Sequence, residues 1–418
     1  MTPAQLSVLF FLQMTAIVVT CRVVGWLSHR YLAQPQVVGE MIAGVLLGPT
    51  LFGLVAPDLQ AALFPPESKK VLYVGAQLGV GLYMFLVGLG FDRNEFRSNA
   101  RQAALVSVAG MAAPFAAAAL LVPWMLGIDG LFAAKVNQAQ ATLFLGSAIA
   151  ITAFPMLARI IHERGISDTP LGTLSLSAGA IGDAGAWIVI AMVLASLGEG
   201  NAVAIKAIGG GFGFAAFMVL LAPRLLARFE AMTERAGGLS EGILAAVLVL
   251  FLLSAWAMDA AGIHAVFGGF LLGTAMPRGR FSAELRAKLE PFTVVFLLPM
   301  FFTFSGLNTE LLMVNTPDLL IAAVVILVAS IVAKGGASYL AARLSGQDHA
   351  TAMGIGSLMN ARGLMELIII NIGLQRGIIE PALFALLVLM AIVTTLMASP
   401  LFELVYGRAA RARGELPG

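Results

Sequence analysis

The chain has 418 residues, of which 59% are hydrophobic and only 11% are charged, and its formal net charge is +2. This composition excludes a water-soluble globular domain and predicts an all-α polytopic membrane protein. The small net charge gives no indication of nucleic-acid binding, and the single Cys21 excludes a disulfide framework and a cysteine metal motif.

The first hydrophobic segment follows Gln5 directly, without a basic region or a small-residue cleavage motif before it. We therefore expect a retained first helix rather than a cleaved signal peptide. Hydropathy and helix-breaking residues predict about thirteen membrane spans, of which the ninth is short enough to be tilted or re-entrant. The spans lie near residues 5–28, 36–54, 69–91, 102–127, 139–161, 170–197, 203–227, 239–258, 262–276, 289–307, 316–342, 350–374 and 380–406.

The basic residues predict the orientation of these spans. Seventeen of the 25 Lys and Arg residues fall in alternate loops beginning with the first, and five fall in the opposite loops. The other three, Arg22, Lys334 and Arg362, lie inside spans. Because cytoplasmic loops hold most basic residues, we expect the N-terminus outside and the C-terminus in the cytoplasm. As a separate expectation, the membrane is the inner membrane of a bacterium.

A short internal repeat links the second and ninth spans, where segment 44–49 resembles segment 269–273. An offset of seven spans reverses direction across the membrane, as in inverted-topology repeats, although so short a match in a glycine-rich chain can arise by chance. The same offset pairs the fifth span with the twelfth, and both are broken, by Pro155 and by segment 360–363. Paired broken helices indicate a transport site, because freed carbonyls and half-helix ends coordinate ions.

Asp183 stands near the middle of the sixth span, an apolar run from about Pro170 to Ser196. A charge at the bilayer midplane costs at least about 2.5–3.5 kcal/mol, so it is retained only where it faces the protein interior, water or a partner. We predict an ion or proton site at Asp183, with a buried ion-pair partner as the alternative.

Three more charged residues lie deep in the predicted spans. Lys334, midway along the eleventh span, needs a carboxylate partner or must lose its proton. Arg362 and Glu366 are four residues apart, the spacing of a helical ion pair, which predicts a salt bridge that braces the twelfth span. At its predicted break, Arg362 can also stabilise half-helix carbonyls. Glu40, near the start of the second span, is expected to have an interfacial structural role.

Five segments carry a resemblance to a known family, namely 35–49, 151–159, the Asp183 stretch 177–187, 298–302 with 305–307, and 359–367. On these motifs, nearly the whole chain resembles the monovalent cation:proton antiporters. It looks like the branch with the bacterial Kef and NapA-type exchangers and is most similar to the CHX-type cation/H⁺ exchangers of plants and fungi. The resemblance implies a NapA-like fold with inverted repeats and two crossed broken helices.

The same resemblance implies a domain organisation. Residues 1–418 would form a single transmembrane sodium/hydrogen exchanger-type domain that assembles as a homodimer. Within it we expect a mobile core domain near 102–197 and 316–406, a dimerisation domain near 5–91 and 239–307, and a linker helix near 203–227. The cytosolic regulatory domain of Kef proteins is not expected, since the chain ends soon after the last span.

The resemblance also assigns residues to a site. It places Thr152 at the first crossover, Asp183 as the carboxylate for cation and proton, and Lys334 as its charged partner. Supporting charges and helix breaks are expected from Asn360, Arg362, Glu366 and Pro155. Relatives usually have Asp, Asn or Gln before the carboxylate, but this chain has Gly182, which leaves the role of Lys334 open.

We therefore expect electroneutral exchange of K⁺ or Na⁺ for H⁺ at Asp183 by alternating access, serving pH homeostasis, because Gly182 offers no second acid. One alternative is a Na⁺- or H⁺-coupled organic-anion symporter in which Arg362 and Lys334 bind substrate. A cation channel or a non-transporting sensor is another. An enzyme is not expected, since the sequence shows no nucleophile with a base and no metal cluster, and we expect no cofactor and no metal beyond the transported cation.

Overall fold

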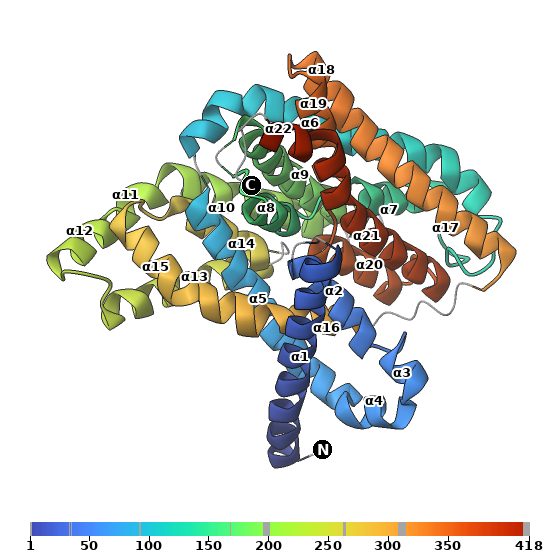
Figure 1. The fold of residues 1–418 in the computed structure, drawn as a ribbon, viewed down its shortest axis with the longest axis horizontal. Coiled ribbons are helices and arrows are strands. Elements are labelled where there is room, and N and C mark those ends of the chain that lie inside the picture. Colours follow the sequence, from blue (N-terminus) through green and yellow to red (C-terminus); the bar gives the residue numbers. More distant parts are fainter. Residues whose placement is uncertain are drawn as a thin grey trace. The chain divides into compact units, whose positions relative to one another are not determined.

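The computed structural model describes residues 2–32, 34, 36–91, 93–167, 169–194, 201–261, 265–307 and 315–412. The side chains of some helical residues, those of Pro155 and Asp183 among them, lie outside the described part. Over these ranges the secondary structure is helical (Figure 1), with one isolated antiparallel bridge between Phe132 and Ile379. The predicted all-α class is confirmed.

Eight described helical stretches are long and apolar enough to cross a membrane, and Gly209–Leu220 with Ala222–Arg235, bent by 47°, forms a ninth candidate. The chain is an integral membrane protein. These candidates come from the described residues alone, so the number of about thirteen spans stays a prediction.

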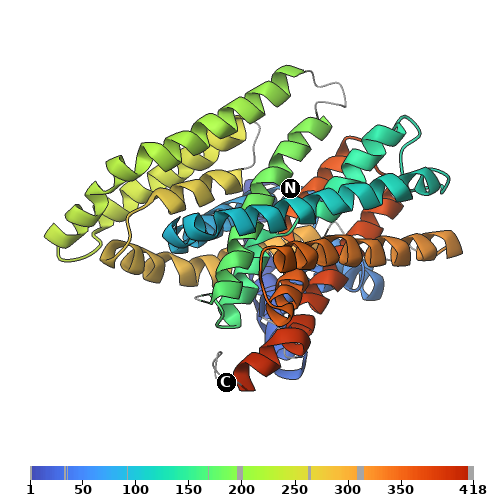
Figure 2. The same cartoon turned by 90° about the horizontal axis from the view of Figure 1, so that it is seen from above.

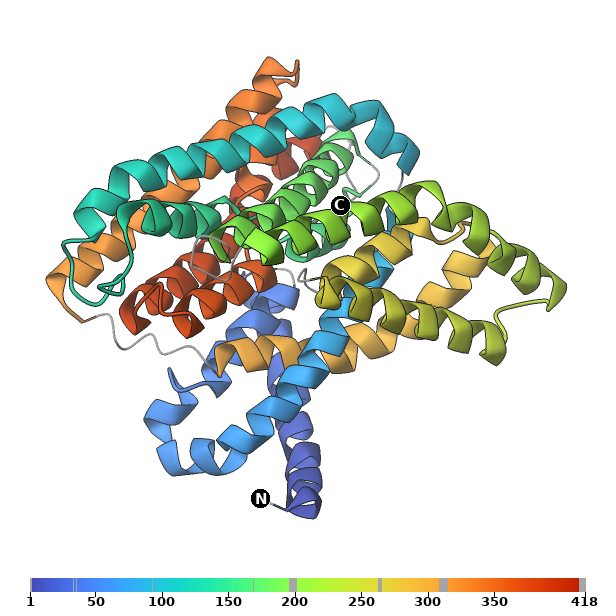
Figure 3. The same cartoon turned by 180° about the vertical axis from the view of Figure 1, so that it is seen from behind.

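One compact unit consists of residues 1–20, 56–93 and 198–304. Besides the first part of α1 (Pro3–Leu32) and most of α16 (Leu298–Gly306), it contains α4 (Pro57–Leu63), α5 (Pro66–Gly90), α10 (Asn201–Leu220), α11 (Ala222–Leu226), α12 (Arg228–Arg235), α13 (Glu241–Ala260), α14 (Ala265–Ala275), α15 (Arg280–Phe292) and a π-helical turn at Thr293–Leu297. In its core α14 lies along α5, as Figure 3 also shows. The backbones approach so closely that a Cβ on Gly273 would overlap the Phe85 carbonyl.

The second unit consists of residues 21–55, 94–197 and 305–418. Besides the last part of α1, it contains α2 (Gln36–Leu47), α3 (Phe52–Val55), α6 (Arg93–Met125), α7 (Gln138–Ala150), α8 (Phe154–Glu163), α9 (Pro170–Leu194), α17 (Pro317–Ser330), a π-helical turn at Ile331–Gly336, α18 (Ala337–Leu344), α19 (His349–Leu358), α20 (Leu364–Gln375), α21 (Pro381–Phe402), a π-helical turn at Glu403–Gly407 and α22 (Arg408–Ala412). The stretch Pro381–Gly407 is the most buried of the eight candidate spans, at 72%, since α21 contacts α2, α17, α19 and α20.

Helices α6 and α18 lie side by side within the second unit. Figure 2 shows α6 in blue-green running along the orange α17 and α18. At one end, the Gln347 side chain donates a hydrogen bond to Oε1 of Gln102, at 3.0 Å. The π-helical turn between α17 and α18 contains Lys334, and such turns occur frequently at functional sites.

The sequence places all of residues 5–91 in the dimerisation domain, whereas residues 21–55 belong to the second compact unit. The units describe packing and not motion or assembly. The division into a mobile core and a dimerisation domain therefore stays a prediction.

Candidate functional site

The fifth predicted span is broken in the second unit. Helix α7 ends at Ala150 and α8 begins at Phe154, with extended backbone at Ile151 and Ala153 between them. Pro155 stands in the first turn of α8, where its missing N–H costs no helical hydrogen bond. The predicted break is confirmed, and the proline starts the second half-helix.

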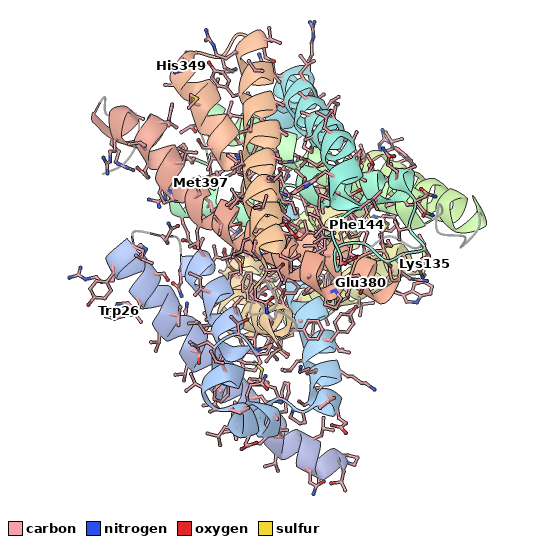
Figure 4. All side chains as sticks on the ribbon, turned by 90° about the vertical axis from the view of Figure 1, so that its right-hand side faces the viewer. Trp26, Lys135, Phe144, His349, Glu380 and Met397 are labelled. Carbon is pink, nitrogen blue, oxygen red and sulfur yellow. The ribbon has the colours of Figure 1, made fainter. Side chains whose placement is uncertain are left out.

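The twelfth predicted span is broken as well. Helix α19 ends at Leu358 and α20 begins at Leu364, so the break contains Asn360, Arg362 and Gly363. Figure 4 shows His349, at the start of α19, and Glu380, just beyond α20, toward opposite ends of this broken helix.

The two breaks meet and are hydrogen-bonded to each other. The backbone N–H of Ala153 donates to the carbonyl of Ala361 at 3.1 Å. The buried Thr152 hydroxyl donates to the carbonyl of Met359 at 2.9 Å. Each break thus satisfies backbone groups that the other leaves without a helical partner, as the interior of a membrane requires. The predicted pair of crossed broken helices is present, with Thr152 in the crossing.

α7 and α20 also touch beyond the crossing. A Cβ on Gly373 of α20 would overlap the ring of Phe144 on α7, labelled in Figure 4. The loops beyond them pair, since Ala133 N–H donates to the Ile378 carbonyl at 3.2 Å. This packing fixes α7 against α20 on one side of the breaks.

Lys334 occupies the end of the first half-helix. Its buried ammonium group donates a hydrogen bond to the carbonyl of Ala150, the last residue of α7. That carbonyl has no partner within its own helix, and the positive charge opposes the negative end of the helix dipole. The sequence predicts that Lys334 either has a carboxylate partner or loses its proton. The structure adds a third arrangement, a lysine that caps a broken helix.

Arg362 and Glu366 form the predicted ion pair. Both side chains are fully buried, and Nη1 of Arg362 lies 3.5 Å from Oε1 of Glu366. The same Nη1 donates to the carbonyl of Ala148 at 2.9 Å. Arg362 therefore has both of its predicted roles at once. Its guanidinium group braces α20 through Glu366 and also stabilises a carbonyl in the last turn of α7.

Several polar atoms at the second break have no hydrogen-bond partner among the described residues. They are Nε and Nη2 of Arg362, both carboxylate oxygens of Glu366, and Oδ1 of Asn360, whose Nδ2 donates to the Gly356 carbonyl at 3.0 Å. Buried polar groups are usually satisfied, so unpaired ones mark this position as specialised rather than merely structural.

Thr395 is a residue of the crossing that sequence reasoning missed. Its hydroxyl accepts a hydrogen bond from the backbone N–H of Arg362 at 2.9 Å and so holds the break against α21. The signal in the sequence is the adjacent pair Thr394-Thr395 in an otherwise apolar final span.

Asp183 lies on α9, which contacts α7, α8 and α19. Its side chain, like that of Pro155, is outside the described residues. The backbone at this level is close to its neighbours, since a Cβ on Gly179 would lie 2.7 Å from a methyl group of Leu157 on α8. A Cβ on Gly182 would lie 3.2 Å from the Ser107 hydroxyl on α6.

Glu40 is buried, more deeply than an interfacial position suggests. It lies 3.8 Å from Arg22 Nη1 and accepts a hydrogen bond from the Gln36 side chain at 3.2 Å. Arg22, which is predicted to lie inside the first span, is thus beside the carboxylate of Glu40. These residues support α2 and α1 and belong to no part of the crossing.

The chain resembles known proteins both in sequence and in fold. Residues 16–405 match the family model "Sodium/hydrogen exchanger, transmembrane". The chain is 37% identical over 393 residues to the Na⁺/H⁺ antiporter NhaS4 of Synechocystis sp., covering 92% of this chain and 94% of that protein.

Longer relatives match as well. Cation/H⁺ antiporter 18 of Arabidopsis thaliana is 33% identical over 97% of this chain, and K⁺/H⁺ antiporter 1 of Saccharomyces cerevisiae is 31% identical over 95%. The chain spans about half the length of these two relatives, 50% and 46%. Among solved structures, the sodium proton antiporter MjNhaP1 of Methanocaldococcus jannaschii superposes with a TM-score of 0.68 at 12% identity over 100% of both chains.

Proposed function

Because this chain belongs to the sodium/hydrogen exchanger family, we propose that it is a secondary transporter that exchanges a monovalent cation, K⁺ or Na⁺, for H⁺. NhaS4, which matches over nearly its whole length, is named a Na⁺/H⁺ antiporter, and the yeast relative is named a K⁺/H⁺ antiporter. Antiport is thus common to both, while the choice of cation differs between them.

The observation that carries this proposal is the crossing of two broken helices within one compact unit. It brings half-helix ends, a lysine and an arginine together at breaks that lie inside two apolar helices. Such a crossing is characteristic of transporters with midplane ion sites. The likeness to MjNhaP1 supports the fold alone.

We assign the exchange to Asp183. Lys334 and Arg362 donate to carbonyls of α7, and Glu366 pairs with Arg362, so these charges hold the crossing together beside it, with Lys334 also the charged partner of the site. A protonated Asp183 is neutral and cannot balance a cation, so cation and proton exclude one another. With Gly182 in place of a second acid, one negative charge serves both ions, which makes the exchange electroneutral.

The remaining parts of the proposal concern assembly and motion. The core domain near 102–197 and 316–406 moves against a dimerisation domain in a homodimer, and this exposes Asp183 to the two sides of the membrane in turn. The N-terminus lies outside and the C-terminus in the cytoplasm of a bacterial cell. The distribution of basic residues supports this orientation.

The test uses purified protein in proteoliposomes with a trapped pH-sensitive dye, pulsed with K⁺, Na⁺, Li⁺ or choline. We expect K⁺ or Na⁺, but not choline, to drive proton movement and Asp183→Asn to abolish it. Asp318→Asn, at the exposed start of α17, is the matched control and should exchange like the parent. Exchange by Asp183→Asn at the parental rate would contradict the assignment of the exchange to Asp183. A dependence of turnover on membrane potential would contradict electroneutral exchange.

The same proteoliposomes test the alternative that the protein is an organic-anion symporter. In that arrangement Arg362 and Lys334 would bind an organic anion, although both already donate to backbone carbonyls. Uptake of a labelled organic acid coupled to Na⁺ would favour it over antiport.

A further inference from the structure

Three buried serines in the second unit, Ser107, Ser175 and Ser338, differ from the serines that donate to a carbonyl of their own helix. A helical serine in an apolar setting usually donates to a carbonyl one turn earlier, as Ser330 does to Leu327 and Ser357 to Met353, both at 2.8 Å. Ser107 on α6 is 4% exposed and Ser338 on α18 is fully buried, yet neither hydroxyl has a hydrogen-bond partner in the described structure. A buried hydroxyl without a partner is unfavourable, and Ser107 and Ser338 lie at one contact between helices, so a polar ligand at that contact would satisfy both.

The positions of the two hydroxyls connect α9 with the helix that carries Lys334. The Ser107 oxygen is the atom nearest to the position of a Cβ on Gly182, at 3.2 Å, and Gly182 directly precedes Asp183. The Ser338 oxygen lies 2.8 Å from the position of a Cβ on Gly110. Gly110 is one helical turn from Ser107, as Ser338 is from Lys334. The serines therefore lie along the contact of α6 with α18, two helices that Figure 2 shows next to each other.

A hydroxyl at this place has the chemistry of a cation ligand. Its oxygen offers two lone pairs and carries no charge. Neutral oxygens can replace the hydration shell of a monovalent cation, as backbone carbonyls do in K⁺-selective filters. Near Gly182, where no second acid is available, a neutral ligand leaves one negative charge per cation.

We propose that the Ser107 hydroxyl is a direct ligand of the transported cation beside Asp183 and that Ser338, farther along the same contact, is a second, weaker one. This inference rests on the proposed antiport and deepens it. It makes Ser107 a residue that determines cation affinity, and it assigns to Gly182 the role of keeping space open in front of that hydroxyl.

The experiment measures the apparent KM and the maximal rate for K⁺ and Na⁺ in the proteoliposome assay. We expect Ser107→Ala to raise the KM for the transported cation about fivefold, the equivalent of one hydrogen-bond-sized interaction, at a nearly unchanged maximal rate. Ser107→Thr, which keeps the hydroxyl, should restore the parental KM. Ser338→Ala should raise the KM less. Ser330→Ala is the matched control, because the Ser330 hydroxyl donates to a carbonyl of its own helix.

Gly182→Ala gives a second test that does not remove the hydroxyl. The added methyl group would stand 3.2 Å from the Ser107 oxygen and compete with the cation there, so the KM should rise as in Ser107→Ala. Binding is read independently from the shift of the thermal unfolding midpoint by K⁺ or Na⁺ relative to choline, which should shrink in both variants.

The outcomes separate this inference from the proposed function. If Asp183→Asn exchanges like the parent, the proposed function itself fails. If Asp183→Asn is inactive while Ser107→Ala and Gly182→Ala keep the KM and the cation-dependent shift of Ser330→Ala, only the serine ligand is overturned. A loss of maximal rate at constant KM would likewise show a structural role for Ser107 and overturn it.

Discussion

Replacement of Arg362 by methionine tests whether the charges at the second break hold the crossing together. Arg362 and Glu366 are both fully buried, and their ion pair spans 3.5 Å. The substitution keeps an unbranched side chain of similar reach. It removes the cation that faces Glu366 and the hydrogen bond to the Ala148 carbonyl.

The magnitude follows from what each variant leaves behind. Arg362→Met leaves a buried carboxylate without this partner, which typically costs about 3–5 kcal/mol. Removing both charges in Arg362→Met with Glu366→Met leaves only the lost bond to the Ala148 carbonyl, about 1.5–3 kcal/mol for a charged donor. We therefore expect the double variant to be more stable than Arg362→Met and less stable than the parent.

Thermal unfolding in detergent micelles, followed by tryptophan fluorescence, ranks these variants. The midpoint should be highest for the parent, intermediate for the double variant and lowest for Arg362→Met. Arg343→Met, at an exposed position on α18, is the control and should change stability by no more than about 0.5 kcal/mol. Equal midpoints for the parent and Arg362→Met, or a double variant that is less stable than Arg362→Met, would refute the reasoning.

Three more predictions concern single contacts. Lys334→Met should destabilise the protein by about 1.5–3 kcal/mol in the same unfolding assay, because it leaves the Ala150 carbonyl at the end of α7 without its charged donor. Lys334→Arg keeps a charged donor and should lose only part of that stability. Thr152→Val should lower the unfolding midpoint through one lost hydrogen bond, about 1 kcal/mol, whereas Thr152→Ser should not, and equal midpoints for the two would contradict a role of the hydroxyl. Asp348→Ala removes the N-cap of α19 and should cost about 0.5–2 kcal/mol, with Asp348→Asn as the control that keeps a capping oxygen. Hydrogen bonds from Thr351 lower the pKa of Asp348 below the usual value of an aspartate, so the stability that its charge contributes is fully present above that usual value. The advantage of the parent over Asp348→Asn in unfolding assays should disappear as pH falls through the lowered pKa, and an advantage that grows toward acid pH would contradict this assignment.

Local composition was enough to predict the helices and their breaks. Apolar runs indicate helices because backbone groups in a membrane must be satisfied within the same segment. A proline at 155 and the polar segment 360–363 interrupt two such runs, and both breaks are present where predicted. The spacing of Arg362 and Glu366 likewise predicts a pair that needs one helical turn and no distant contact.

The tertiary structure decided which groups these residues meet. Lys334 reaches a carbonyl 184 positions away in the chain, and Arg362 reaches one 214 positions away. No periodicity in the sequence encodes such distances, because they depend on how whole helices pack. The hydroxyl of Thr395 at the second break and that of Ser107 near Gly182 have the same origin. The sequence by itself therefore determined where the chain is helical, where it breaks and which charges lie in the membrane. Only the packing of distant helices decided that the two breaks cross, that a lysine caps one of them, and which hydroxyls lie at the second break and near Gly182.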